Sequence, residues 1–245
     1  MNIIIGIDDT DNLETRGTGH HARMLGHALT DAGLFELRSV TRHQLFADKR
    51  IPFTSHNSSA SLMGRCTRTI REVIFFSKDF LIRESAFDSD AGLCVAPEDA
   101  ITSAMILFGN RAKHEILSME EALQLVAGTS IFLDGFLNAR IGMIGSLAAV
   151  GLAKEGNDGR LLWTRNLRET TGNFTIQELL QQVDIERVVE KDLAETDLQA
   201  MISIGEWCRP VMLGGKITLI AEKIENNSTY AYKSASKEYI KSISE

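Results

Sequence analysis

The hydrophobic pattern of the chain opens with a short apolar run. Residues 3–7 read Ile-Ile-Ile-Gly-Ile, and Asp8, Asp9 and Asp11 follow almost at once. β-branched residues in an unbroken run are typical of a buried strand, and polar residues at its end are typical of a turn. The sequence therefore predicts a buried strand that ends in an acidic turn.

Helical spacing begins after this turn. Ala22, Leu25, Leu29 and Ala32 recur at intervals that place them on one face of a helix. Gly33 follows them, and glycine is the residue that most often ends a helix. The pattern predicts a helix that ends at this glycine.

The segments that follow complete a recognisable order of elements. We predict strands at 37–46 and 55–63, a helix from about 66 to 84, and a strand at 92–96. With the first strand and helix, these elements give the order βαββαβ within residues 2–96. That order is typical of a ferredoxin-like sandwich, an antiparallel sheet covered by helices on one face. The expected fold class is α/β, of the α+β type.

The rest of the chain predicts a second, smaller α+β unit. Its most distinctive segment is 141–153, where small and apolar residues on all sides predict a helix that is buried nearly all round. The other predicted elements are helices at 100–108, 119–127 and 175–183, a strand at 161–164, and a hairpin at 211–222 that turns at Gly214-Gly215.

Chain length and composition favour two modest domains. The 245 residues, of which 44% are hydrophobic, can fill two cores. We expect a first domain at 1–115, which carries the acidic turn, and a second at 116–224. Residues 225–245 are polar and weakly patterned, which predicts a surface helix or a loose tail.

Charge and cysteine content narrow the classes of function. The net charge of -7 argues against a protein that holds nucleic acid by broad neutralisation of phosphates, and small-molecule or phosphate-ester chemistry fits more easily. Cys66, Cys94 and Cys208 are widely spaced and suggest no disulfide framework. We expect a cytoplasmic protein with no secretory signal and no membrane span.

The acidic turn is the first candidate site. Asp8, Asp9 and Asp11 repel one another unless a cation or hydrogen-bond donors lie among them. Mg²⁺ takes oxygen ligands, often one or two carboxylates together with substrate phosphates, so these three residues are candidate metal ligands and catalytic groups. The alternative is an acidic turn in which Asp8 or Asp11 caps the following helix.

A glycine-flanked loop lies next to the acidic turn. Gly17, Thr18 and Gly19 precede a helix, and free backbone N–H groups at such a point can hold a phosphate. His20 and His21 follow as candidate proton acceptors or phosphate contacts. The alternative for the glycines is a simple turn, and for the histidines a position on the surface at the start of the helix.

Two further glycines begin the apolar helix. Gly142 and Gly145 could let backbone N–H groups face an anion, although close packing against a strand is the commoner reason for such glycines. Both explanations stay open from the sequence alone.

Three motifs occur together in a familiar order. Residues 6–11 read GIDDTD and precede Arg16-Gly17, residues 51–57 read IPFTSHN, and residues 142–151 read GMIGSLAAVG. This succession resembles the archaeal 2-agmatinylcytidine synthetase family, which modifies the anticodon of isoleucine tRNA. The motifs span roughly residues 1–222, and three in one order are far more specific than any one of them.

The resemblance implies a kinase-like domain that uses ATP, here residues 1–115, joined to a ferredoxin-like domain, here 116–224. The family splits ATP to AMP and pyrophosphate, phosphorylates a cytidine carbonyl oxygen, and lets agmatine displace the phosphate. It further implies that the acidic motif handles Mg²⁺ and phosphates, that Asn57 binds substrate or nucleotide, and that Thr10 lies within the nucleotide site or only supports the turn.

The sequence also departs from the family pattern. A threonine pair that follows the Arg-Gly in the family, one of which is phosphorylated, is replaced here by His20-His21. The oligonucleotide-binding barrel and the zinc ribbon of the family would follow residue 222, and we expect them to be absent. These differences predict that the nucleotide chemistry is kept while the tRNA substrate is not.

The expected function is an ATP- and Mg²⁺-dependent phosphoryl- or nucleotidyl-transfer enzyme that acts on a small molecule. The alternatives are a nucleotide-binding sensor or subunit without catalysis, and a tRNA-modifying enzyme that works with a separate RNA-binding subunit. A purely structural acidic turn is the third. The predicted catalytic residues are Asp8, Asp9, Asp11, His20 and His21, and the predicted nucleotide-binding residues are Thr10, Gly17, Thr18, Gly19, Asn57, Gly142 and Gly145.

Overall fold

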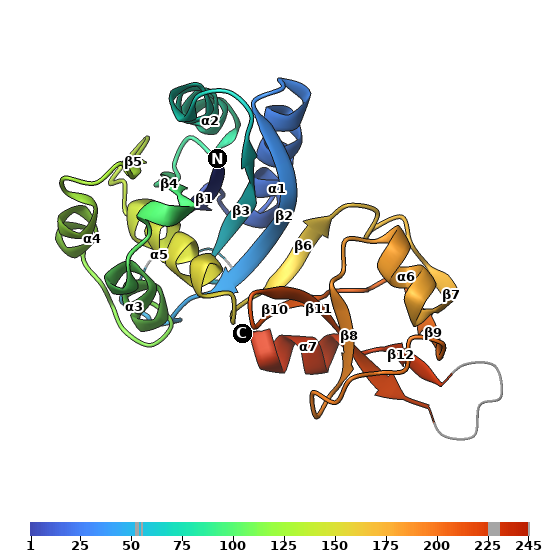
Figure 1. The fold of residues 1–245 in the computed structure, drawn as a ribbon. Helices are drawn as coiled ribbons and strands as arrows, with labels where there is room; N and C mark the ends of the chain where they lie inside the picture. Colours follow the sequence, from blue (N-terminus) through green and yellow to red (C-terminus); the bar gives the residue numbers. More distant parts are fainter. Residues whose placement is uncertain (52–53, 55, 225–230, 245) are drawn as a thin grey trace. The chain divides into compact units, whose positions relative to one another are not determined.

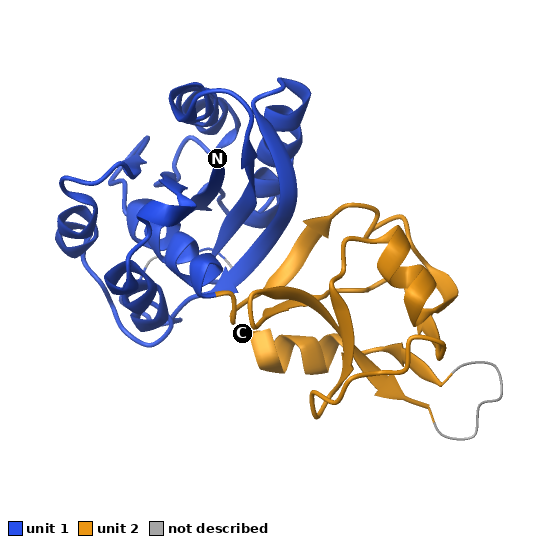
Figure 2. Ribbon diagram, viewed as in Figure 1, with its two compact units in different colours: residues 1–155 blue, residues 156–245 orange. Residues whose placement is uncertain are grey.

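The computed structural model describes residues 1–51, 54, 56–224 and 231–244 (Figure 1). The chain divides into two compact units, residues 1–155 and 156–245 (Figure 2). The predicted boundary at 115/116 therefore falls inside the first unit.

Unit 1 is built on an antiparallel sheet with the strand order β5-β4-β1-β3-β2. Within it, the order β4-β1-β3-β2, with a helix after β1 and another after β3, is that of a ferredoxin-like sandwich. The predicted βαββαβ order is confirmed. The bounds are β1 Asn2–Asp8, α1 Thr18–Asp31, β2 Phe35–Gln44, β3 Ser58–Cys66, α2 Ile70–Glu84, β4 Gly92–Pro97 and β5 Phe132–Gly135.

Helices cover both faces of this sheet. Figure 1 shows α1 and α2 on one face and α5 on the other, with α3 and α4 packed beside α5. The prediction of helices on one face only holds for the βαββαβ part, and the later helices add a third layer. Their bounds are η1 Glu98–Ala100, α3 Ser103–Arg111, α4 Met119–Val126 and α5 Gly142–Glu155.

Glycine residues at the contact allow α5 to lie close to the sheet. A β-carbon on Gly6 of β1 would overlap the backbone oxygen of Ser146 in α5, and a β-carbon on Gly92 of β4 would overlap the backbone of Gly142. Residues 145–153 of α5 are all buried, as the apolar pattern predicts. The helix thus forms part of the core of unit 1, which is why the division of the chain falls after residue 155.

Helix α2 begins later than predicted. Cys66 is the last residue of β3, and Thr69 caps the helix by accepting a hydrogen bond from the backbone N–H of Glu72, whose carboxylate in turn accepts from the N–H of Thr69. This capping box fixes the start of the helix at residue 70.

Unit 2 is a β-rich unit with the strand order β6-β10-β11-β12-β9-β7, and β8 pairs in parallel with β11. This order differs from the ferredoxin-like arrangement expected for residues 116–224. The hairpin at Gly214-Gly215 is confirmed, and both glycines have positive φ angles, of 60° and 72°. The bounds are β6 Arg160–Thr164, β7 Gly172–Thr175, α6 Ile176–Gln182, β8 Arg187–Glu190, β9 Met201–Ile204, β10 Val211–Leu213, β11 Lys216–Lys223, β12 Tyr232–Ser234 and α7 Lys237–Ser244.

The described part of the predicted tail belongs to unit 2. β12 pairs with β11 and β9, and Ile240 of α7 packs in a small core with Val189 and Val211. The segment is therefore a strand and a surface helix rather than a loose tail, while residues 225–230 and 245 lie outside the described residues. Across the described parts of both units, no helix is both long and apolar enough to cross a membrane.

Candidate site at the end of the first strand

The acidic turn lies where β1 ends. Asp8 is the last residue of the strand, and Asp9 takes a left-handed conformation with φ of 51°. Among residues with a side chain, aspartate and asparagine tolerate this conformation best. Asp8 and Asp9 both line the same cavity from successive positions.

Asp11 is held by hydrogen bonds to the start of α1. One oxygen of its carboxylate accepts from the backbone N–H and from the hydroxyl of Thr18, at 2.9 and 2.7 Å, and the other accepts from the hydroxyl of Thr54 at 3.1 Å. Asp11 thus contacts the first residue of α1, although the N-cap residue of that helix is Gly17 and makes no side-chain cap. The carboxylate of Asp11 positions the helix start at one side of the cavity.

A chain of buried hydrogen bonds extends from this point. The hydroxyl of Thr10 lies 3.2 Å from that of Thr18 and 2.8 Å from Nδ1 of His21, and all three residues are buried. Burial lowers the pKa of His21, and the neighbouring His20 lowers it further. His21 is thus a buried partner of Thr10 and is not among the residues that line the cavity.

Asp8 lies against the first turn of α5. A β-carbon on Gly145 would overlap the carboxylate of Asp8, and one on Gly142 would lie 2.9 Å from the backbone oxygen of Asp8. The two glycines thus allow the carboxylate to lie beside the amino-terminal end of the helix, where the dipole favours negative charge. Packing is the reason for these glycines, and that packing brings α5 to the site.

The turn opens into a cavity of about 220 Å³ within unit 1. Its lining residues are of two kinds, acidic and polar residues on one hand and apolar residues and glycines on the other. The acidic and polar residues are Asp8, Asp9, Asp11, Thr18, Arg50, Thr54, His56, Asn57, Ser58 and Glu115, and the remaining lining residues are Leu45, Ile51, Ala112, Ile116, Leu117, Ile141, Gly142, Ile144 and Gly145.

Burial and mutual repulsion raise the pKa values of two of the carboxyl groups. Burial raises the pKa of Asp8 well above its usual range, and Asp9 and Asp11 raise it further, against a hydrogen bond from the backbone of Asp9. Burial also raises the pKa of Asp9 to about 6, and Asp90 and Asp11 contribute by repulsion. Both shifts disfavour the charged carboxylate unless a cation or further hydrogen-bond donors lie beside it.

The donor set fits a cation that shares its ligands with a phosphate. Within the described ranges, no group of three or more His, Cys, Asp or Glu side chains is arranged to hold a metal ion. Mg²⁺ does not need such a group, because it commonly takes one or two carboxylates and completes its shell with waters and substrate phosphates. Asp8 and Asp9 offer two carboxylates of this kind.

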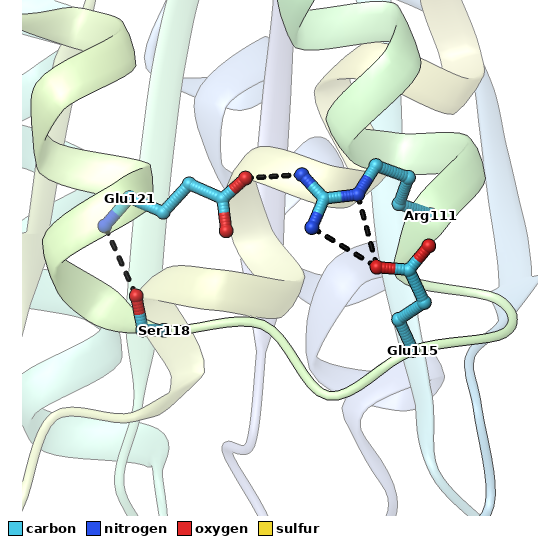
Figure 3. A network of polar contacts seen from close by, with 4 residues as sticks. All are labelled: Arg111, Glu115, Ser118 and Glu121. Carbon is cyan, nitrogen blue, oxygen red and sulfur yellow. Dashed lines mark hydrogen bonds and ion pairs between the residues drawn. The ribbon is translucent and has the colours of Figure 1, made fainter.

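One wall of the cavity is held by a charged network (Figure 3). Arg111, at the end of α3, contacts Glu115 through Nε and Nη2, both at 3.0 Å, and contacts Glu121 of α4 through Nη1. The loop between these helices carries Ile116 and Leu117 into the lining. Arg111 therefore braces the apolar wall from outside.

The structure brings only some of the predicted residues together. Asp8, Asp9, Asp11, Thr18, Asn57, Gly142 and Gly145 line the cavity. Thr10, Gly17, Gly19, His20 and His21 are not among the lining residues, although Thr18, the first residue of α1, is. Asn57 uses its amide to donate to the backbone oxygen of Phe46 at 2.7 Å. Pro52, Phe53 and Ser55 of the middle motif lie outside the described residues.

Sequence reasoning missed several lining residues. Arg50, His56 and Glu115 face the cavity, and the apolar wall from residues 112–117 was not predicted. Arg50 and His56 flank or belong to the middle motif, which was a usable signal. Nothing in the local pattern of 112–117 marked that loop, since only its packing beside α5 places it there.

Comparison with solved structures shows that this chain and TiaS share a similar fold over 62% of this chain. No protein-family model matches the chain. The fold resembles that of TiaS, an agmatidine synthetase that acts on an isoleucine tRNA. The crystal structure of apo TiaS matches with a TM-score of 0.52 and 22% identity, over 62% of this chain and 35% of TiaS. The complex of TiaS with its tRNA and ATP matches with a TM-score of 0.53, also at 22% identity, over 62% of this chain and 36% of TiaS.

A sequence relative covers a similar share of the chain. An uncharacterized protein of Methanocaldococcus jannaschii, MJ0921, is 28% identical over 152 residues, which are 62% of this chain and 50% of the relative. This chain thus spans about half the length of that relative and about a third of TiaS. The suspected resemblance to the tRNA agmatidine synthetase fold is confirmed at the level of structure.

Proposed function

We propose that the cavity of unit 1 binds ATP with Mg²⁺ and that the protein transfers a phosphoryl or nucleotidyl group to a small molecule. One observation carries this proposal. Asp8 and Asp9, both with raised pKa values, face a cavity whose other wall is apolar. Such a cavity suits a ligand with two parts. One part is anionic and is bound together with a metal cation at the acidic end, and the other is planar and uncharged and contacts the apolar wall.

The apolar wall suits the base of the nucleotide. Leu45, Ile116, Leu117 and Ile144 offer aliphatic surface to a flat ring, and ligand sites are mostly apolar with a few placed polar groups. Asn57 and Glu115 lie on the same lining and supply polar groups for orientation.

The acidic end suits the phosphates only through a metal ion. Asp8 and Asp9 would hold Mg²⁺, which would neutralise the charge that develops on a transferring phosphoryl group. Asp11 already accepts three hydrogen bonds, so it orients Thr18 and the start of α1. Thr18 lines the cavity at this end, and the first turn of α5 adds the partial positive charge of a helix start.

The related structures support the nucleotide part of this proposal. Complexes of TiaS contain its tRNA together with ATP, or with AMPCPP and agmatine. For this chain we propose a smaller substrate, because 26 Lys and Arg face 33 Asp and Glu. Filter binding against total tRNA at about 150 mM salt tests the point. Saturable sub-micromolar binding that prefers one tRNA would restore RNA as the substrate.

Calorimetry tests the nucleotide site directly. We expect ATP to bind with Mg²⁺ and far more weakly with EDTA, and we expect Asp9→Asn to remove the Mg²⁺-dependent part. Asparagine keeps the left-handed backbone of residue 9, so the fold should survive. Asp31→Asn is the matched control, because Asp31 is an exposed carboxylate at the end of α1. Failure of the wild type to bind millimolar ATP would end the proposal.

A nucleotide sensor without catalysis is the second candidate. It is favoured by His21, which stands where the related family has a threonine and is buried against Thr10. A sensor would bind ATP and release no AMP, ADP, pyrophosphate or phosphate in a product assay with Mg²⁺. Release of any of these products in a manner that depends on Asp9 would favour the enzyme.

A further inference from the structure

A chain of buried polar groups joins the acidic turn to the first turn of α1. Thr18 and His21 are three positions apart in the helix, so their side chains lie on the same side of it. The hydroxyl of Thr10 contacts both, at 3.2 Å from the hydroxyl of Thr18 and 2.8 Å from Nδ1 of His21. All three residues are buried, so water does not readily replace a hydrogen bond that is missing among them.

The direction of this chain is set at the end where it meets Asp11. Oδ1 of Asp11 accepts hydrogen bonds from the backbone N–H of Thr18 at 2.9 Å and from its hydroxyl at 2.7 Å. A hydroxyl carries one proton and two lone pairs. The proton of the Thr18 hydroxyl therefore points at Asp11, and its oxygen accepts from the backbone N–H of Thr10 at 3.3 Å and from the hydroxyl of Thr10 at 3.2 Å.

The role of His21 follows from the single hydroxyl proton of Thr10. That proton points at Thr18, so the contact of 2.8 Å between Thr10 and His21 is a hydrogen bond only if Nδ1 carries a proton and donates it. The opposite assignment, with Thr10 donating to a bare Nδ1, leaves the two threonine oxygens 3.2 Å apart with no proton between them. A buried contact without its hydrogen bond costs free energy, so the assignment that satisfies every contact is favoured.

The chain ends on groups of the proposed nucleotide site. Asp11 and Thr18 both line the cavity. The second oxygen of Asp11 accepts a hydrogen bond from the hydroxyl of Thr54, which is another lining residue. His21 is not among the lining residues, so any effect that it has on the cavity passes through Thr10.

We infer that His21 is a positioning residue, which holds its proton on Nδ1 and begins a chain of donors through Thr10 and Thr18 that fixes the carboxylate of Asp11 at the cavity. All donors of this chain point toward Asp11, and hydrogen bonds aligned in one direction strengthen one another. The consequence for nucleotide binding rests on the proposed function, whereas the position of the proton and the direction of the chain do not.

Nitrogen-15 NMR of the full chain measures the position of the proton without any nucleotide. The two neutral forms of a histidine ring differ in the cross-peaks that join the ring nitrogens to the carbon-bound ring protons. The chain has six histidines, and the signal of His21 is the one that disappears in His21→Asn. At about pH 8 the ring is neutral, because burial lowers its pKa below the usual 6.5. We expect the proton on Nδ1, and a proton on Nε2 would overturn the inference.

Two variants of His21 separate the role of Nδ1 from that of the ring. The side-chain N–H of asparagine reaches the place of Nδ1, whereas the longer glutamine reaches that of Nε2, and both variants lose the ring. The backbone N–H of Thr18, which donates to Asp11, should exchange with deuterium severalfold faster in His21→Gln than in His21→Asn. With Mg²⁺, the dissociation constant of ATP should rise about fivefold or more in His21→Gln and less than about twofold in His21→Asn, as for one lost hydrogen bond.

Thr10 provides a second pair of variants, and His27 a control. Valine has the shape of threonine without its hydroxyl, so Thr10→Val should behave as His21→Gln does, while Thr10→Ser keeps the hydroxyl and should resemble the wild type. His27→Gln is the matched control, because His27 is an exposed histidine of the same helix and should change neither exchange at Thr18 nor ATP affinity.

The outcomes distinguish this inference from the proposed function. Equal exchange at Thr18 in His21→Asn and His21→Gln, or wild-type exchange in Thr10→Val, would overturn the chain. Equal ATP affinity in all four variants, beside a wild type that binds ATP, would overturn the positioning role. A wild type that binds no ATP ends the proposed function alone, because the NMR and exchange results still decide the chain. Circular dichroism melts check that His21→Gln is folded, and the Thr10 pair decides if it is not.

Discussion

Gly145 has no side chain at the place where Oδ2 of Asp8 lies, and a β-carbon there would overlap that oxygen. The relationship joins the carboxylate at the end of β1 to the first turn of α5. It means that the acidic end of the cavity keeps its shape only while position 145 is glycine.

Gly145→Ala should therefore weaken Mg²⁺-dependent ATP binding by about tenfold or more, because Asp8 must leave its position. Alanine is the better helix former by up to about 1 kcal/mol, so the melting temperature should change little or fall only moderately. Calorimetry and thermal melts measure the two effects. Gly205→Ala is the control, since a β-carbon there meets nothing within 4 Å. Wild-type affinity in Gly145→Ala would refute the assigned role of Asp8.

The second prediction concerns stability against pH. The pKa of Asp9 rises from its usual 3.8 to about 6 in the folded protein. A raised folded-state pKa contributes stability that is present below about pH 4 and is lost as the pH rises through about 6. Asp9→Asn should therefore be more stable than wild type at about pH 8, by up to about 3 kcal/mol, and equally stable at about pH 4.

Urea denaturation at the two pH values measures this difference. The same experiment with Mg²⁺ should narrow the gap at the higher pH, because a cation would neutralise Asp8 and Asp9 in the wild type alone. A gap that is equal at both pH values would show that Asp9 is not disturbed by its neighbours.

The third prediction separates a structural histidine from a catalytic one. His21→Ala removes a buried ring and its hydrogen bond to Thr10, and should cost about 2–4 kcal/mol of unfolding free energy. His20→Ala should cost less than about 0.5 kcal/mol, since His20 lies near the surface. Urea melts of both variants provide the comparison.

The pH dependence gives a further check on His21. Burial lowers its folded-state pKa below the usual 6.5, so its contribution is present above that value and lost as the pH falls through the folded pKa. The penalty of His21→Ala should accordingly shrink in acid. A nucleotide-binding defect in His21→Ala without any loss of stability would contradict the structural role.

The fourth prediction concerns the braced wall in Figure 3. Arg111→Gln breaks the contacts to Glu115 and Glu121 and should loosen the loop that carries Ile116 and Leu117. Exposed ion pairs contribute little to stability, so the free energy of unfolding should fall by less than about 1 kcal/mol. ATP affinity should fall severalfold because the apolar wall is no longer preorganised.

Arg83→Gln is the matched control for that variant. Arg83 pairs with Asp79 through exposed side chains of α2, in the same i, i+4 spacing as Arg111 with Glu115. It should leave ATP affinity unchanged. If both variants weaken ATP equally, or neither does, the loop is not a wall of the nucleotide site.

The local pattern of the sequence was sufficient for most elements of unit 1. The run of isoleucines in β1 is typical of a buried strand, and the apolar residues of α1 recur at helical spacing. Gly214 and Gly215 mark a hairpin because their positive φ angles suit glycine best. The acidic turn was visible for the same reason, since three carboxylates directly after a buried strand have few structural uses.

Tertiary structure decided which of these residues meet. The carboxylate of Asp8 faces α5 and that of Asp9 is disturbed by Asp90, and both partners come from distant parts of the chain. His21 looked like a site residue from its position, yet the side on which it leaves α1 buries it against Thr10. The local spacing of residues does not indicate toward which other element a side chain points.

The domain boundary shows the same limit. The composition of residues 141–153 predicts a buried helix, but it does not indicate in which of the two cores the helix is buried. Gly6 and Gly92 of the sheet show that it is the core of unit 1, because the absence of a side chain at these positions lets the backbone of α5 pack closely against the sheet. A sequence thus determines elements through interactions between near neighbours, while the site depends on close packing between elements, which forms only when the chain is folded.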